Sequence, residues 1–226
     1  MEFLQRSIAK KIFMIPIIGT LMFLAFLAIS SFTALTSVKT LEHTRDVQFP
    51  VLQRSESALV QLERVKESLA SAVTTGDEEA LNTATAFADQ LKKSLKEITQ
   101  LEKASAGDIN QIEKSFEEYF ALAFKVSQEM VTNTADMASI GERSQKMNTF
   151  YDASNQKLSS FRDTQLKEFK DSIEDASEQA SGLITLGAIM ALITTLALFG
   201  TAIPVVNNIK NSLGHIIRSL RDLAKE

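Results

Sequence analysis

Histidine serves in proteins as a general base and metal ligand, and cysteine as a nucleophile and metal ligand. This chain of 226 residues has two histidines and no cysteine. In the membrane topology that its charge pattern predicts, His43 and His215 lie on opposite sides of a bilayer, so they cannot form one site. An acidic cluster at residues 77–79 is explained by helix capping. We therefore expect no enzyme: no catalytic residue, no metal and no cofactor.

Arginine and asparagine side chains are the candidates for ligand binding. A guanidinium group makes a planar, bidentate match to a carboxylate, which singles out Arg54 and Arg64. The alternative for Arg64 is an ordinary ion pair with Glu67, three residues further along the helix. Asn133 is a candidate ligand contact, a register-setting residue or the frayed end of a helix.

Two stretches of the sequence are uncharged and apolar. They cover residues 12–38 and 179–209, which are 27 and 31 residues long, and about 20 apolar residues suffice to cross a bilayer as a helix. The first stretch exceeds the apolar core of a signal peptide, typically about 7 to 15 residues, so we expect an uncleaved anchor. The sequence predicts transmembrane helices at 12–35 and 182–206.

The charges outside these stretches predict the topology. The tails, residues 1–11 and 210–226, carry seven cations and three anions, a net charge of +4. Because the net charge of the whole chain is −4, the segment between the tails has a net charge of −8. By the positive-inside rule, both termini are cytoplasmic and residues 36–181 are periplasmic, as in a multi-pass protein of a bacterial inner membrane. The basic run at Lys92, Lys93 and Lys96 is then an exposed helix face, and we expect no nucleic-acid partner.

The periplasmic segment reads as all-α, because helix formers dominate it and strand signals are almost absent. Turn signals divide it into helices at about 36–74, 78–105, 108–138 and 142–181. Gly76 suits a left-handed helix end and Asp77 suits an N-cap, while Asp108 and Gln111 have the spacing of a capping box. Apolar residues recur every three or four positions, which predicts an antiparallel four-helix bundle with these seams: Leu81, Ala84, Ala88, Leu91, Leu95 and Ile98; Ile109, Ile112, Phe116, Tyr119, Ala123, Val126 and Met130; Met147, Tyr151, Ser154, Leu158 and Phe161.

Irregularities in this pattern mark positions of interest. The apolar spacing in the last helix breaks between Phe161 and Leu166, either as an adjustment to a neighbour or as a flexible point in signalling. Pro50 predicts a kink near one membrane boundary and Pro204 marks the other. The outer two helices are the longer pair, so each subunit presents only two helices near the bilayer. This favours a homodimer.

The residues after Pro204 carry a separate heptad seam, spaced 4, 3, 4 and 3: Ile209, Leu213, Ile216, Leu220 and Leu223. This segment, 207–226, resembles the first helix of a HAMP domain, with Ser212 where such helices commonly have proline. The stretch 219–224 is similar to the sequence before a Gly-Asp-Leu turn in methyl-accepting chemotaxis proteins. Residues 49–52 and 72–77 also resemble the exported bundles of those chemoreceptors.

The resemblance implies a bacterial chemoreceptor, cut before its output region. It would be a homodimer within inner-membrane lipid, and such dimers would join into higher receptor assemblies. An unknown small ligand or a periplasmic binding protein would act on the bundle, and a cytoplasmic adaptor and kinase would couple to a region absent from this chain. The alternatives are the sensor half of a membrane histidine kinase or diguanylate cyclase, and a membrane coiled-coil scaffold that senses nothing.

Overall fold

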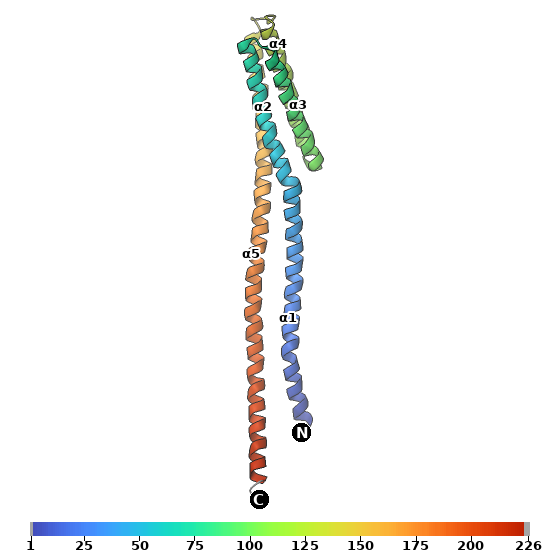
Figure 1. Ribbon diagram of the computed structural model, residues 1–226, viewed down its shortest axis with the longest axis vertical. Coiled ribbons are helices and arrows are strands. Elements are labelled where there is room, and N and C mark those ends of the chain that lie inside the picture. The colour runs from blue at the N-terminus through green and yellow to red at the C-terminus, as the bar shows by residue number, and fades with distance from the viewer. Residues whose placement is uncertain (1, 224–226) are drawn as a thin grey trace. The chain divides into compact units, whose positions relative to one another are not determined.

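The computed structural model describes residues 2–223, and every regular element in that range is helical, which confirms the all-α class (Figure 1). The π-helical turn η1 covers Thr44–Gln48 and the 3₁₀ turn η2 covers Lys103–Ser105. The α-helices are α1 (Glu2–His43), α2 (Phe49–Thr75), α3 (Glu78–Leu101), α4 (Ala106–Val131) and α5 (Ile140–Leu223).

The chain divides into two compact units. The helix-pair unit contains the described part of residues 1–39 and 176–226, which belongs to α1 and α5. The core unit contains residues 40–175, including α2, α3 and α4. Both α1 and α5 therefore contribute residues to each unit.

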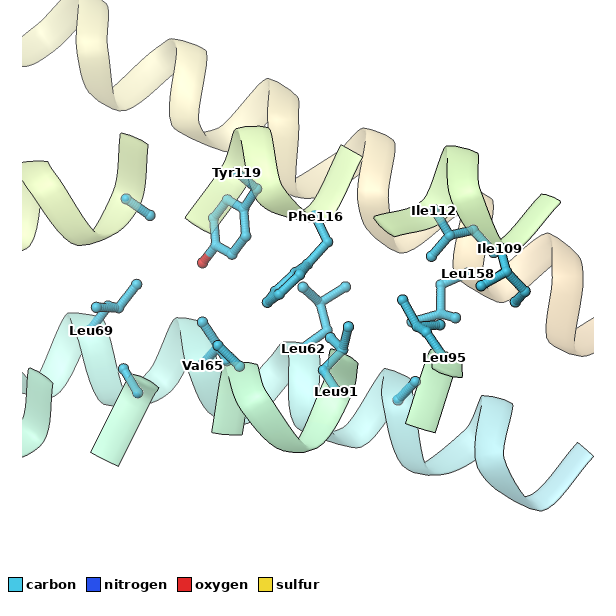
Figure 2. Close-up of a cluster of buried hydrophobic side chains, with 14 of the residues drawn as sticks. Leu62, Val65, Leu69, Leu91, Leu95, Ile109, Ile112, Phe116, Tyr119 and Leu158 are labelled. Carbon is cyan, nitrogen blue, oxygen red and sulfur yellow. The ribbon is translucent and has the colours of Figure 1, made fainter. Parts of the chain in front are cut away.

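A single hydrophobic cluster fills the core unit (Figure 2). Its members recur at three- and four-residue spacing, because that spacing places side chains on one face of a helix. The predicted seams of α3 and α4 are buried from Leu81 to Ile98 and from Ile109 to Val126. The largest fully buried apolar side chains come from four helices: Val51, Leu62 and Val65 of α2, Leu91, Leu95 and Ile98 of α3, Ile109 and Phe116 of α4, and Leu158 of α5.

The turn between α2 and α3 forms as predicted. Gly76 adopts a left-handed conformation with a φ of 70°, which glycine reaches at little steric cost. Its N–H and that of Asp77 both donate to the Ala72 carbonyl, at 2.8 and 3.3 Å. Asp77 Oδ1 then accepts from the Glu79 N–H at 2.8 Å, so the end of one helix and the start of the next are satisfied within four residues.

Helix α4 is displaced from its expected range. It begins at Ala106, ahead of Asp108, so the predicted capping box is wrong, and its N-cap residue makes no side-chain capping bond. It ends at Val131 rather than near 138. Asn133 has a φ of 54°, the Asn133 N–H donates to the Met130 carbonyl at 3.2 Å, and the next N–H donates to the Glu129 carbonyl at 2.8 Å. These bonds form a Schellman motif with asparagine at the left-handed position.

Helix type changes immediately before Pro50. Within η1, the Phe49 N–H donates to the Thr44 carbonyl, five residues back. Pro50 follows at the start of α2, where the preceding π turn has already changed the register of the backbone hydrogen bonds. The proline is thus accommodated by an inserted π turn, and the kink predicted here remains a prediction.

Within the helix-pair unit, α1 and α5 pack antiparallel. Ser37 Oγ donates to Gln179 Oε1 at 2.6 Å, and Thr194 Oγ1 donates to the sulfur of Met22 at 3.7 Å. Gly187 faces the Phe26 ring, and an added Cβ there would lie 3.5 Å from the ring, an ordinary van der Waals distance. As the α1 residue number rises, its α5 partner's number falls, which is the signature of antiparallel helices.

Five threonine side chains within these helices are satisfied locally. Thr20 and Thr36 of α1 donate to the carbonyl four residues back, at 2.7 and 3.1 Å. Thr185, Thr195 and Thr201 of α5 do the same, at 3.1, 2.8 and 2.8 Å. Such bonds let hydroxyl groups occupy an apolar environment without a second partner.

Two stretches of helix, within 16–75 and 140–211, are long and apolar enough to cross a membrane. None of the most apolar window in either stretch is buried against protein. Phe32 is 74% exposed and Ile184 is 76% exposed. A core helix of a globular protein buries such side chains, so the outward apolar surface of both helices suits lipid.

Candidate functional site

A cavity of about 490 Å³ lies beside the connection between α3 and α4. We call it the glutamine cavity. Its wall includes Glu102 and Ser105 of the connection, Ile112 of α4, and Phe161 and Gln165 of α5. Ser105, Ile112, Phe161 and Gln165 are buried, so the cavity has a floor built from several elements. Three further charged residues line it: Asp108, Lys157 and Glu168.

Gln165 is the unusual residue of this cavity, because only 4% of its surface is exposed. Its Nε2 lies 3.5 Å from Glu102 Oε2, which also accepts a hydrogen bond from Ser105 Oγ. Its Oε1 is buried and has no hydrogen-bond partner in the protein. If the amide were turned over, Oε1 would face the Glu102 carboxylate, and two acceptors would then oppose each other. The Nε2 donor therefore faces Glu102, and the Oε1 acceptor stays unpaired.

A second cavity, of about 400 Å³, is lined by α2, α4 and the first turns of α5. We call it the tyrosine cavity. Tyr119 and Tyr151 meet edge to face with their ring centroids 5.4 Å apart, a favourable aromatic geometry. Lys66 Nζ lies 4.2 Å from the centroid of the Tyr151 ring. The remaining wall is mainly apolar: Leu69, Ala70, Val73, Ala123, Val126, Met130, Ile140 and Met147.

The two tyrosines are held in their neutral form. Burial raises the pKa of Tyr119 above its usual range, with smaller contributions from Tyr151 and Glu63. Burial also raises the pKa of Tyr151, and its hydroxyl donates to the Glu63 carboxylate, which raises it further. The tyrosine cavity therefore offers apolar surface and neutral hydroxyl groups near Lys66.

The three residues predicted to bind a ligand, Arg54, Arg64 and Asn133, each have different neighbours in the structure. Arg54 pairs with Glu97 of α3, with its Nε 2.6 Å from the carboxylate. The Arg64 guanidinium lies over the Phe87 ring, 5.3 Å from its centroid, and Asn133 ends α4. None of the three lines the glutamine or the tyrosine cavity, and their role in ligand binding remains a prediction.

The relay positions fall on α5. Pro204 lies inside this helix. Of the heptad seam, Ile209 is partly exposed and Leu213 is 53% exposed. The side chains of Ile216, Leu220 and Leu223 lie outside the described part of the structure, as does that of His215. His43 is exposed at the end of α1. Residues 224–226, the last of the predicted HAMP helix, also lie outside the description.

Counting apolar residues alone missed Gln165. The count placed a phase break between Phe161 and Leu166, whereas the buried positions run from Leu158 to Phe161 to Gln165, a regular spacing of three and four. The heptad spacing could have identified Gln165, because a polar residue at a seam position is a candidate for a specific contact.

Within the described residues, no group of three or more histidine, cysteine, aspartate or glutamate side chains is placed to hold a metal ion. The residues that line the two cavities offer a ligand hydrogen bonds, charge and apolar contact. No protein-family model, no curated protein and no solved structure matches the chain.

Proposed function

We propose that this protein is a homodimeric transmembrane receptor of the chemoreceptor type. In this proposal, residues 36–181 form a periplasmic four-helix bundle that senses a stimulus, and both termini are cytoplasmic. The stimulus changes the position or packing of α5, and the residues after Pro204 act as the first HAMP helix and pass that change to cytoplasmic chemotaxis signalling.

The observation that carries the proposal is the extent of α5. One helix, Ile140–Leu223, holds Leu158 and Phe161 in the hydrophobic cluster, contains a stretch apolar enough to cross a membrane, and continues to the heptad seam. A helix without an intervening loop transmits a small shift along its axis, because each turn is hydrogen-bonded to the next. The same helix lines both cavities through Gln165 and Tyr151.

The proposed dimer would cover apolar surface that one chain leaves exposed. Leu213 and Ile217 are both more than half exposed, at 53% and 58%. These residues follow the apolar stretch, where the proposed topology places them in the cytoplasm. A second copy packing along the seam would cover Leu213, as in a parallel coiled coil.

In vivo disulfide crosslinking tests this relay, because the chain has no cysteine of its own. Single cysteines at Ile209, Leu213, Ile216 and Leu220 should crosslink strongly in the membrane, while the matched controls at Asn211 and Ser219 should crosslink weakly. Uniformly weak crosslinking at all six positions would refute the dimeric relay.

Two alternatives share this front end: the sensor half of a histidine kinase or diguanylate cyclase, and a membrane scaffold. The region after Glu226 separates the first from a chemoreceptor, since a nucleotide-binding catalytic domain there would favour a membrane enzyme. A scaffold would show seam crosslinking that no bound ligand changes, because a ligand shifts an equilibrium only by its different affinity for two states.

A further inference from the structure

The tyrosine cavity contains a buried hydroxyl group that has no partner in the described part of the protein. Only 2% of the surface of Tyr119 is exposed, and this residue lines the cavity. Its hydroxyl makes no hydrogen bond to a described residue. It is nevertheless not one of the sealed side-chain atoms without a partner, which in the described residues are the Oε1 atoms of Gln48, Gln61 and Gln165. The Tyr119 hydroxyl is therefore open to a small molecule in the cavity.

Figure 2 shows where this hydroxyl points: it extends from α4 towards α2, on the side of Leu69. Leu69 also lines the cavity, as do Val73 of α2 and Ala123 and Val126 of α4. Ala123 and Val126 follow Tyr119 by about one and two helical turns, so they continue the same face of α4. The hydroxyl thus lies at one end of an apolar wall.

Lys66 supplies a second hydrogen-bond donor at this end of the cavity. Its Nζ lies 4.2 Å from the centroid of the Tyr151 ring, and the Tyr119 ring lies 5.4 Å from the same ring, centroid to centroid. The Tyr151 hydroxyl itself donates to Glu63, so it is already engaged. The two donors that adjoin Tyr151 are the Tyr119 hydroxyl and the Lys66 ammonium group.

The charge near these donors favours an uncharged ligand. Lys66 Nζ lies 3.6 Å from Glu63 Oε1, so the ammonium charge is balanced within the protein. A ligand carboxylate beside Lys66 would also meet the Glu63 carboxylate, and like charges repel. A ketone oxygen is uncharged and can accept from both donors. Unlike an alcohol, a ketone brings no donor of its own that would need a partner in an apolar cavity.

We infer that the tyrosine cavity binds a short, uncharged, straight-chain ketone. Its carbonyl oxygen accepts from the Tyr119 hydroxyl and the Lys66 ammonium group, and its alkyl chain packs on Ala123 and Val126, which removes the chain from water. A cavity of about 400 Å³ is within the usual range for small-molecule sites. The inference rests on the proposed function where it makes the ketone a stimulus, because Tyr151 lines the cavity from α5, the proposed signalling helix.

The test is isothermal titration of the full chain, in an uncharged detergent, with hexan-2-one, against a blank of the same detergent without protein. The wild type should bind hexan-2-one saturably beyond the blank. Hexanoate, which has six carbon atoms and a charged head, should bind about tenfold more weakly or less, because burying a carboxylate beside Glu63 costs free energy. Tyr119→Phe keeps the ring and removes the hydroxyl. It should weaken hexan-2-one binding about fivefold, the usual effect of losing one hydrogen bond.

Ser55→Ala is the matched control. It also removes a fully buried hydroxyl from the hydrophobic core, but Ser55 lines neither cavity, so its variant should bind hexan-2-one like the wild type. Circular dichroism establishes that each variant is folded. Tyr119→Phe removes no hydrogen bond to a described residue, so its fold should be intact.

Three results would overturn the inference: no saturable binding of hexan-2-one by the wild type, undiminished affinity in the Tyr119→Phe variant, or equal affinity for hexanoate. None of them depends on the relay, which seam crosslinking measures without a ligand. Lost binding with intact seam crosslinking removes the ketone site and leaves the proposed receptor standing. Intact binding with no seam crosslinking does the reverse.

Discussion

The Arg143 guanidinium on α5 donates a hydrogen bond to the Glu129 carboxylate on α4, across the turn that contains Asn133. Both side chains are about three-quarters covered. The bond lowers the pKa of Glu129 and raises the pKa of Arg143, although partial burial opposes each shift. This pair therefore ties the end of one helix to the start of the next.

The pair predicts a specific loss of stability in acid. Because the pKa of Glu129 is lowered by folding, the pair stabilises the fold above about pH 4.3, the ordinary pKa of a glutamate, and loses that contribution as the pH falls through the lowered pKa. Arg143→Gln should lower the melting temperature by a few degrees at neutral pH, and its difference from the wild type should vanish in acid.

Thermal unfolding in detergent between neutral pH and pH 3 measures this difference. Lys92→Gln is the control, because it removes the more exposed ion pair with Glu117, and such surface pairs contribute little. Equal effects of the two substitutions would contradict the importance of the α4–α5 pair.

The two tyrosines predict the behaviour in alkali. With burial as the main cause, the pKa values of Tyr119 and Tyr151 are raised by folding, so the folded state keeps protons that the unfolded state loses above about pH 10. Stability should fall as the pH rises beyond that value. Phenolate absorbance should appear together with unfolding, and the chain's lack of tryptophan leaves these two rings as the reporters.

Tyr151→Phe separates the two contributions, because Tyr119 then supplies the signal alone. A phenolate band that develops near pH 10 while the helical circular dichroism is unchanged would show that the rings are not protected.

The turn at Gly76 predicts a backbone effect free of steric contacts. A Cβ there would meet nothing within 4 Å, but the φ of 70° is strained for any L side chain. Gly76→Ala should therefore reduce the free energy of unfolding by about 1 kcal/mol. Denaturant unfolding checks this value. Gly107→Ala, which has the same open surroundings in α4 and no positive φ, should cause no loss.

Burial of the α2 seam predicts the largest effect on stability. Leu62 is 1% exposed in the hydrophobic cluster, so Leu62→Ala should cost about 2 to 5 kcal/mol through lost burial and the cavity left behind. Leu101 is 37% exposed and provides the same substitution at a partly solvated site. If both variants had the same denaturation midpoint, the cluster around Leu62 would not be the stabilising core.

The sequence was informative where a local pattern determines structure. The seams from Leu81 to Ile98 and from Ile109 to Val126 are buried as predicted, because the 3.6-residue period of a helix fixes which residues share a face. Gly76 ends α2 and Asp77 caps the start of α3, as predicted. Glycine is the residue that most readily adopts the left-handed helix end, and aspartate is a preferred N-cap.

Features that depend on contacts between distant segments were not accessible in this way. The end of α4 depends on a left-handed asparagine, Asn133, whereas the sequence pattern continued this helix to about residue 138. Gln165 became significant only when its amide was seen beside Glu102, 63 residues earlier in the chain. The ion pair of Arg54 with Glu97 likewise joins two helices, and sequence spacing gives no information about such partners.

The carbonyl-bonded threonines of α1 and α5 have a consequence for motion in a lipid bilayer. Since these hydroxyl groups are satisfied within their own helix, displacing one helix along the other breaks none of their bonds. A shift of one helix along the other would instead have to break the two hydrogen bonds that join α1 to α5 in the described residues, from Ser37 to Gln179 and from Thr194 to the sulfur of Met22. Side-chain packing also holds the pair together, for example where the Phe26 ring lies beside Gly187.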